Sequence, residues 1–471
     1  MKQATFFVVL ATILSVFFTA CADNEDFSTN NQLKLTFSTE EVSFDTIFSE
    51  LGSTTRQFKI YNRNNNSLVI QSIEVMNPEK SGFRINIDGE YGTNIKDVDI
   101  LKKDSLYGFI QITAPPSGSD APFVIRDSIK FTYNGNIQYL QLQAIGQDVY
   151  IWKGNKAISR DTVIANSKPV LIYGSVEIKS NTTTTIKEGT TIFMEPSASI
   201  HIHGSLKIEG SVKSPVVIRG SRFDKMDNTI PYDNIPGQWD GIYFYPESYK
   251  NNLENLVIKN ATKGMTFYAS TTKEVKATLT NTIVQNTSEY GVLATNSKIE
   301  AVNCLFANSR GASLELRGGE YTFLHCTIGN YFSWLTRKKE TLVLDGDSEV
   351  KNVTLTVYNF INSIISGSAK SEFSFNNQDN TASSYLFHNC IIKGKEYANS
   401  SFENILWNTD PLFQDLNKDR LYFYNFELQA TSPAINKADK AYSVKYPFDL
   451  KGRPRLIDAN PDIGCYEWVG E

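Results

Sequence analysis

Four histidines are the residues most suited to acid–base or metal chemistry in this chain of 471 residues. His201 and His203 are two apart in a strand-like run, so their side chains are expected to face the same way. The pair could form half of a metal site, but no third ligand is evident, and exposed strand residues are the alternative. We therefore expect no metal and no other cofactor, with structural calcium left open. No catalytic triad of His325 or His388 with Ser, Cys or Asp residues can be recognised from the sequence.

Carboxylates and basic side chains could instead act on a glycan. A glycoside hydrolase needs two carboxylates roughly 5–9.5 Å apart on one face, and a lyase needs a Lys or Arg base beside a neutralised uronate carboxylate. The acidic pairs are Asp97/Asp99, Asp224/Asp227, Asp345/Asp347 and Asp458/Asp462, and the basic candidates are Lys259, Arg310 and Arg317. The pairs lack the tandem-Asp pattern of polygalacturonase-like hydrolases, and each basic residue has a surface charge as its alternative. No catalytic residue is therefore assigned.

Sugar binding requires no catalytic residues, because sugars can stack on exposed aromatic side chains. The segment that follows residue 238 is dense in aromatics, and period-two alternation would place Trp239, Tyr243 and Tyr245 on one face of a regular strand. Packing between repeats is the alternative. A second candidate site is the loop that contains Trp334 and Arg337, within an unusually long repeat interval. An ordinary tolerated insertion is the alternative there.

A short sequence motif that recurs along the chain, here called the repeated phrase, must position these residues. It opens on a polar residue, continues through a β-branched or aromatic residue, and ends on Asn or Gly. Its six copies begin at Asn255, Asn281, Asn303, His325, Asn362 and Asn389, at intervals of 26, 22, 22, 37 and 27 residues. A period in the twenties, with a short β-prone run and a bend in each copy, predicts a solenoid that adds one coil per repeat. A catalytic site should break such a repeat rather than obey it.

Cysteines occupy matching places in the repeat. Cys304, Cys326 and Cys390 hold the second position of three copies, where a small buried side chain suits the stacking of coils. Stacking would bring the thiols near one another, so a disulfide stays open in an exported chain, although free buried thiols are favoured. The chain has no CxxC pair, which argues against zinc.

The N-terminus reads as a secretory signal over residues 1–20, with an apolar core that ends just before Cys21. Small residues directly before this cysteine resemble a bacterial lipobox, which implies that Cys21 is lipidated; ordinary signal cleavage is the alternative. Acyl chains contribute ~0.8 kcal/mol per buried methylene and would anchor the protein on a membrane. Residues 21–32 are expected to be the lipidated cysteine and a flexible tether. Acidic residues in this tether resemble the surface-export signal of Bacteroides-type lipoproteins, with a solvated tether as the alternative.

The rest of the chain divides by strand pattern into an all-β fold. Short alternating apolar runs and an Asn134-Gly135 hairpin signal predict an antiparallel, immunoglobulin-like β-sandwich over residues 33–149. Short strands broken by glycines, followed by the repeats, predict a parallel β-helix over residues 150–410. Residues 411–471 are irregular, and we expect them to cap the solenoid end, which would otherwise expose unpaired strand edges.

Several phrases carry a resemblance to a known family. They are Pro236 to Ile242 (PGQWDGI), Asp410 to Phe413 (DPLF) and the tail Asp462 to Glu467 (DIGCYE), in which Cys465 stands where Ala is usual. With them the chain resembles the right-handed parallel β-helix lipoproteins of Bacteroides-type bacteria, which have a pectate-lyase-like β-helix. The resemblance covers nearly the whole mature chain and implies architecture. It says little about activity, because β-helices include lyases, hydrolases, adhesins and passive stalks.

A formal net charge of −5 argues against nucleic acid as a partner. The leading hypothesis is a monomeric, lipid-anchored protein of the outer membrane, exposed at the cell surface, in which the sandwich is a spacer. The β-helix would bind a glycan or another surface component such as a cell-surface protein, or serve as an adhesin-like structural module. A polysaccharide lyase or glycoside hydrolase is the alternative, so whether the protein is an enzyme stays open.

Overall fold

The computed structural model describes residues 26–165, 167–227, 229–345, 356–376, 383–417 and 419–470. The predicted signal peptide and Cys21 lie outside these ranges. The chain divides into two compact units between Asp148 and Val149. Within the described ranges, no helix has the length and apolar character needed to cross a membrane.

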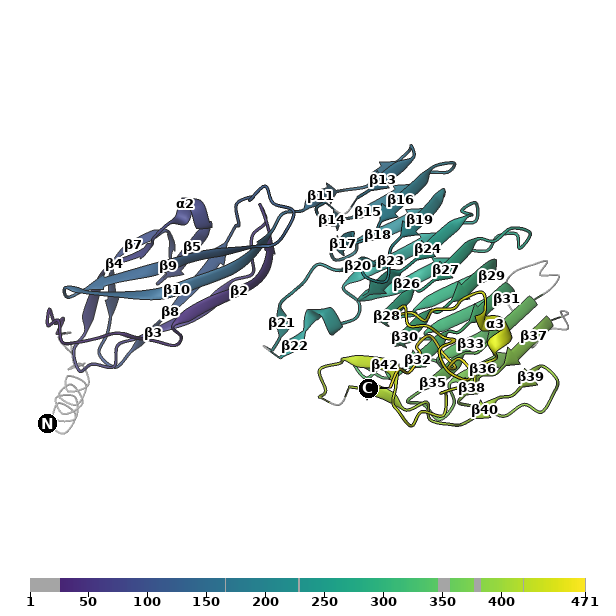
Figure 1. The fold of residues 1–471 in the computed structure, drawn as a ribbon. Helices are drawn as coiled ribbons and strands as arrows, with labels where there is room; N and C mark the ends of the chain where they lie inside the picture. The colour runs from purple at the N-terminus through teal and green to yellow at the C-terminus, as the bar shows by residue number, and fades with distance from the viewer. Residues whose placement is uncertain are drawn as a thin grey trace, which may run out of the picture. The chain divides into compact units, whose positions relative to one another are not determined.

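The first unit is a sandwich of two five-stranded sheets (Figure 1). One sheet has the order β1 (Thr36–Phe37), β3 (Arg56–Tyr61), β8 (Ser105–Ile112), β5 (Phe83–Ile87) and β6 (Glu90–Gly92). The other has the order β2 (Glu41–Phe48), β10 (Asn136–Gln147), β9 (Phe123–Tyr133), β4 (Leu68–Val75) and β7 (Asn94–Ile100), and the short helix α2 spans Pro78–Ser81. Alternating apolar residues of both sheets form its core.

Two details of this unit differ from the sequence expectation, and one confirms it. Strand β2 runs parallel to β10, so the sandwich is not wholly antiparallel. Residues 26–32 are not a free tether, because Ser28 N–H donates to Ser67 O (2.9 Å) and Ser67 N–H to Asp26 O (3.1 Å). The predicted hairpin is confirmed: Asn134 and Gly135 both have positive φ (46° and 73°) between β9 and β10.

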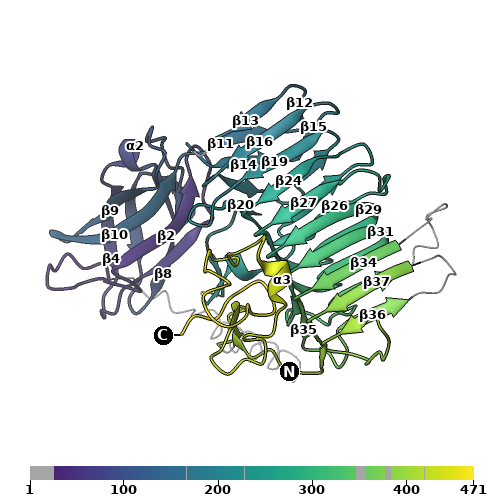
Figure 2. The same cartoon turned by 45° about the vertical axis from the view of Figure 1, so that its right-hand side comes forward.

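The second unit is a right-handed parallel β-helix whose coils have three faces (Figures 1 and 2). Face A consists of β12 (Lys156–Ile158), β15 (Ser175–Ile178), β18 (Ser199–Ile202), β23 (Trp239–Phe244), β26 (Ala261–Phe267), β33 (Leu342–Asp345) and β36 (Phe373–Asn376). Face B consists of β13 (Thr162–Ile164), β16 (Thr183–Lys187), β19 (Ser205–Glu209), β24 (Asn251–Glu254), β27 (Ala277–Thr280), β34 (Thr356–Ile361), β37 (Ser383–His388) and β39 (Phe402–Glu403). The long strands β29 (Val292–Val302) and β31 (Leu314–Leu324) bend and belong to both faces.

Face C is the separate eleven-stranded sheet. Its strands are β11 (Tyr150–Lys153), β14 (Val170–Tyr173), β17 (Thr191–Met194), β20 (Val216–Gly220), β25 (Leu256–Lys259), β28 (Ile283–Thr287), β30 (Leu305–Ser309), β32 (Thr327–Asn330), β35 (Ile364–Gly367), β38 (Ile391–Ile392) and β40 (Leu406–Trp407). Outside the three faces lie β21 (Lys225–Met226), β22 (Ile230–Pro231), the 3-10 helix η1 (Tyr232–Asn234), β41 (Phe413–Leu416), β42 (Tyr424–Leu428) and α3 (Lys440–Ser443).

Like side chains stack on one another inside the β-helix. The rings of Phe323, Phe360, Phe387 and Phe402 follow one another at centroid separations of 5.0, 5.1 and 4.8 Å. These values match the ~4.8 Å spacing of adjacent strands. Each coil therefore buries its apolar residues against the same position of the next coil.

The repeated phrase marks left-handed bends of the backbone. The first residue of all six copies has a φ between 50° and 54°. This conformation suits Asn and His far better than most side-chain-bearing residues. A seventh, shortened copy begins at Asn404, also with a φ of 54°. Side-chain contacts link some neighbouring bends: Asn281 Nδ2 donates to Asn255 Oδ1 at 3.2 Å, Asn404 Nδ2 donates to Asn389 Oδ1 at 3.1 Å, and Asn362 Nδ2 lies 3.1 Å from His325 Nε2.

The remaining amides bind the C-terminal residues 411–470, here called the closing segment. Nδ2 of Asn303, Asn362 and Asn389 donates to the backbone oxygens of Phe448 (2.8 Å), Asp439 (3.0 Å) and Lys437 (2.7 Å). Apolar side chains of the segment pack on outward residues of β30, β35 and β38. The segment thus extends along one side of the solenoid (Figure 2), whereas a cap over its end was expected. It covers an apolar outer surface that face C would otherwise expose.

Replacing Asn362 by Ala should destabilise the protein more than replacing Asn281. Both have a φ near 50°, so both variants carry the cost of a left-handed Ala, about 1–2 kcal/mol. Only Asn362 also exchanges two hydrogen bonds with the backbone of Asp439, and their loss should cost a further 1–3 kcal/mol or so. Chemical unfolding and proteolysis of the closing segment measure the difference. Equal destabilisation of the two variants would contradict this role for the amide.

Candidate functional site

Register along face A brings together aromatic residues that are far apart in sequence. Strand pairing places His201 of β18 beside Tyr243 of β23. Two residues further along each strand, the same register sets His203 beside Tyr245, and Tyr268 follows at the end of β26. We call these five side chains the His–Tyr face: His201, His203, Tyr243, Tyr245 and Tyr268.

The rings of the His–Tyr face stack from coil to coil. The His203 and Tyr245 centroids are 3.9 Å apart, and those of His201 and Tyr243 are 5.1 Å apart with an interplanar angle of 11°. Tyr268 continues the stack at 5.2 Å from Tyr245 and 6.3 Å from Tyr243. The prediction that His201 and His203 face the same way is confirmed by these contacts.

Hydrogen bonds fix the polar atoms of the inner rings. The ring nitrogens of His201 lie 3.0 Å from Ser199 Oγ and 3.2 Å from Tyr245 OH. Burial lowers the pKa of His201 below its usual 6.5, which keeps the ring neutral at pH 7. Tyr243 OH donates to Asp240 Oδ2 at 2.9 Å. Burial and this carboxylate raise the pKa of Tyr243 far above its usual range, so it remains a neutral phenol.

The turn after β23 carries Tyr245 and Glu247, and a buried lysine holds it. Lys276 Nζ donates to Tyr245 O at 2.6 Å and to Ser248 O at 3.1 Å. Burial lowers the pKa of Lys276 to about 8. Glu247 in turn lies 2.6 Å from His203 Nδ1. Sequence reasoning missed Glu247, Lys276 and Tyr268, because no short motif links them to the histidines.

The expected grouping of Trp239 with the two tyrosines is wrong. Trp239 is 1% exposed and belongs to the core of the β-helix, and its indole N–H donates to Lys259 O at 2.9 Å. The register of β23 with β26 shifts between Gly241 and Ile242. The extra residue of this irregularity lies in β26, where Lys263 and Met265 pair with the consecutive residues Gly241 and Ile242. Along β23 itself Trp239 and Ile242 both belong to the core, whereas Tyr243 stacks on His201, although Tyr243 is only 7% exposed.

A cavity of about 310 Å³ lies beside the same strand. It is lined by Pro196, Ser197, Gly237, Gln238, Trp239, Asp240 and Thr262. Because Asp240 both lines this cavity and accepts from Tyr243, the cavity adjoins the His–Tyr face. It offers amide and hydroxyl groups next to the aromatic rings.

The predicted loop site is bound tightly to the protein itself. Arg337 forms an ion pair with the fully buried carboxylate of Glu372 at 2.6 Å. The Trp334 ring stacks on Tyr422 with centroids 3.6 Å apart, and its indole N–H donates to Asn234 O at 3.3 Å. Both side chains therefore serve packing, which favours the structural alternative for this loop.

The acidic and basic residues considered for glycan cleavage do not converge on one site. Lys259 pairs with Asp233 at 2.6 Å and Arg317 with Glu315 at 2.7 Å, while Arg310 Nε donates to Thr336 O at 3.4 Å. Asp97 and Asp99 are on β7 of the sandwich, Asp224 pairs with Arg222, Asp458 and Asp462 are in the closing segment, and Asp347 is outside the described residues. In the described part of the chain, no three His, Cys, Asp or Glu residues are placed to hold a metal ion.

The remaining sequence candidates are structural. Cys304, Cys326 and Cys390 are free and buried, as favoured from their place in the repeat. His325 is wholly buried and lies 2.7 Å from Ser443 Oγ and 3.1 Å from Asn362 Nδ2. Burial lowers the pKa of His325 well below its usual value.

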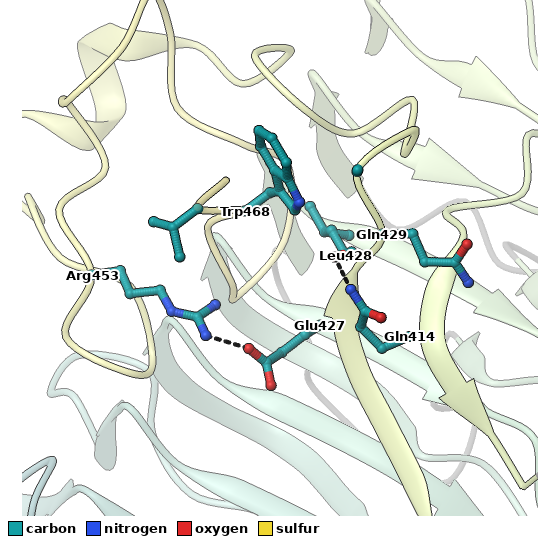
Figure 3. Close-up of a pocket in the computed structure, with 8 residues that line it drawn as sticks. Gln414, Glu427, Leu428, Gln429, Arg453 and Trp468 are labelled. Atoms are coloured by element: carbon teal, nitrogen blue, oxygen red, sulfur yellow. Dashed lines mark hydrogen bonds and ion pairs between the residues drawn. The ribbon is translucent and has the colours of Figure 1, made fainter. Parts of the chain in front are cut away.

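A larger cavity, of about 640 Å³, lies in the closing segment (Figure 3). It is lined by Gln414, Glu427, Leu428, Gln429, Ala430, Arg453, Trp468 and Val469. Glu427 pairs with both Lys451 and Arg453, and Arg453 also donates to Glu467 O at 2.9 Å. Because these charges compensate one another, the cavity wall does not single out a charged ligand.

Comparisons with known proteins address the fold. Residues 127–328 match the model of the right-handed β-helix region family. No curated protein matches the chain. A protein of unknown function from Porphyromonas gingivalis W83 is 12% identical, over 27% of this chain and 50% of that one, with a TM-score of 0.19.

Two further solved structures are glycan-hydrolysing enzymes. A family 123 glycoside hydrolase from Clostridium perfringens is 9% identical, over 26% of this chain and 30% of that one, with a TM-score of 0.18. The catalytic domain of a GH87 alpha-1,3-glucanase in complex with tetrasaccharides is 11% identical, over 76% and 88%, with a TM-score of 0.20. The chain spans half the length of the Porphyromonas protein and less than a third of the Clostridium enzyme. TM-scores this low support no inference about activity.

The burial of His325 predicts a pH-dependent stability. The unfolded chain takes up a proton on His325 near pH 6.5, whereas the folded protein does not. The free energy of unfolding should therefore decrease below pH 6.5, by about 1.4 kcal/mol per pH unit until the folded pKa is reached. His325→Asn restores the residue of the other copies and fits the φ of 51°. Denaturant unfolding between pH 5 and 8 should show a flatter pH dependence for this variant; an unchanged slope would contradict the assignment.

Proposed function

We propose that the protein binds a glycan on the His–Tyr face. The observation that carries the proposal is the place where the aromatic stack stops. Tyr268 is 39% exposed and is the last ring of the stack. The register that pairs Phe267 with Ala294 places the small residue Thr295 at the matching position of the next coil. Among the described residues, the rings that stack on Tyr268 are those of Tyr243 and Tyr245, and Tyr290 of the next coil approaches through its hydroxyl, which lies 2.8 Å from Thr266 Oγ1.

A charged pair follows one coil further. Thr295 pairs with Arg317, whose guanidinium is held by the buried carboxylate of Glu315. At ~4.8 Å per coil, Tyr268 and Arg317 are about 9–10 Å apart along the axis. This interval fits one sugar ring between an aromatic face and a guanidinium. Apolar stacking supplies affinity in such a site, while a few placed polar groups supply orientation.

The cellular setting belongs to the same proposal. Lipidation of Cys21 would anchor the protein in the outer membrane with the β-helix at the cell surface. The resemblance to β-helix lipoproteins of Bacteroides-type bacteria, with an immunoglobulin-like first domain, supports this setting. A surface glycan would then be within reach of an anchored monomer.

One contact favours a second function, cleavage of a uronate glycan by β-elimination. His201 Nδ1 lies 3.2 Å from Tyr245 OH. A neutral His201 would accept the proton on the carbon next to the uronate carboxyl group, and the electron pair of that C–H bond would form a carbon–carbon double bond as the glycosidic C–O bond breaks. Tyr245 would give its proton to the departing oxygen. Formation of unsaturated products from uronate glycans, lost in His201→Gln, would establish this function in place of simple binding.

Two variants test glycan binding from opposite directions. Tyr268→Ala removes the stacking ring and should weaken glycan retention about tenfold or more. Thr295→Tyr should extend the aromatic stack, keep the fold, and abolish retention by filling the interval. Tyr442→Ala is the matched control, because this tyrosine is also 39% exposed but lies on α3. Retention is measured by affinity electrophoresis in a panel of neutral and acidic glycans; wild-type retention by both test variants would refute the site.

The anchor is tested separately by Cys21→Ala. Without the lipidated cysteine the protein should leave the membrane fraction and appear in the soluble one, because no acyl chains remain to partition into the bilayer. Fractionation followed by immunoblotting measures the shift. Unchanged membrane retention would refute the anchor without affecting the glycan site.

A further inference from the structure

The outer face of one sandwich sheet carries exposed aromatic rings. Tyr107 and Phe109 are two apart on β8 and both point outward, with 46% and 39% exposure. Their rings are nearly parallel, at 16°, with centroids 6.3 Å apart. Tyr91 on the edge strand β6 is 62% exposed. Three exposed rings on one sheet are more than a mere spacer needs.

Polar groups surround these rings and shape a cavity of about 330 Å³. Strand pairing sets Asn86 between Phe109 and Tyr91, and Arg84 beside Gln111; all five residues line the cavity together with Thr55. Gln111 Nε2 donates to Thr55 Oγ1 at 2.8 Å, which fixes the amide. The cavity thus combines aromatic surface with amide and guanidinium groups, the composition of a saccharide site.

Cations predominate on the outward face of this sheet. Lys59 and Arg84 occupy outward positions of β3 and β5, while the exposed carboxylate of Glu90 lies on the edge strand β6, at a position paired with the inward Ile87. Lys59 Nζ lies 4.5 Å above the centroid of the Tyr107 ring. Arg84 Nη1 donates only a long bond, 3.3 Å, to Phe83 O. Such a surface complements a ligand with repeated negative charges.

We propose that this sheet, β1-β3-β8-β5-β6, is a second glycan-binding face and that its ligand is a chain of acidic sugars. Sugar rings stack on Tyr91, Tyr107 and Phe109, while their carboxylates pair with Arg84 and Lys59. The spacing of aromatics among polar groups fits a sugar chain better than a protein, whose interface core is depleted of charge. The site shares no residue with the His–Tyr face.

The test uses the full-length protein and three uronate polymers: polygalacturonate, alginate and hyaluronan. Tyr107→Ala combined with Phe109→Ala should weaken binding of at least one polymer tenfold or more, and Arg84→Gln should weaken the same polymer while reducing its salt dependence. Because Tyr107 and Phe109 are exposed and Arg84 is half-buried at the surface, thermal unfolding should stay close to the wild type. The matched control is Tyr139→Ala, a residue 50% exposed on the other sheet.

The outcomes separate this face from the site on the β-helix. Loss of acidic-glycan binding in the β8 double variant, with wild-type binding in Tyr268→Ala, supports the second face. The proposal is overturned if wild-type protein retains none of the three polymers, or if the double variant and Arg84→Gln bind them as wild type does. Equal loss of the neutral polymer dextran in Arg84→Gln would also overturn it, since charge would then not select the ligand.

Discussion

The left-handed bend between faces B and C is the constraint on which the β-helix depends. It recurs at the first residue of every copy of the repeated phrase, with φ values of 50–54°. An ordinary side chain would cost roughly 1–2 kcal/mol at each bend, whereas the short amide of Asn tolerates the conformation. Because the bend fixes where each coil turns, the strands that follow it stack in register. In-register stacking then places like side chains at like positions from coil to coil.

In-register stacking produces columns of like side chains along the β-helix. We expect functional residues where the residue type in a column changes. Inside the solenoid the columns are apolar and closely stacked, as in the run of phenylalanines from Phe323 to Phe402. On face A one outward column runs from Glu177 through His201 and Tyr243 to Thr266. The neighbouring column passes from His203 through Tyr245 and Tyr268 and then changes to Thr295 and Arg317. A purely structural column has no reason to change character in this way. The proposed glycan site depends on this change, which places Thr295 between Tyr268 and Arg317.

The sequence predicts most of the architecture but only part of the site. Period, strand content and Asn bends are local properties, so the β-helix and its free cysteines follow from them. Tyr243 and Tyr245 share a face as alternation requires, yet Trp239 belongs to the core together with Ile242, because the alternation does not extend to the start of β23. The contacts of His201 with Tyr243 cross the insertion that contains β21 and β22. Register across an insertion depends on tertiary stacking, and no local pattern reveals it.

The three faces of the β-helix also differ in how far their outer surfaces are covered. The later strands of face C, from β28 to β40, are covered by the closing segment, which the buried pair of Arg455 and Glu467 holds to Asn303. Face B presents ion pairs between neighbouring coils, such as Lys298 with Glu320 at 3.0 Å, and such exposed pairs are solvated and contribute little energy. Of the described faces, face A is the one with outward aromatic columns. This cover stabilises the scaffold and leaves face A as the face on which we propose glycan binding.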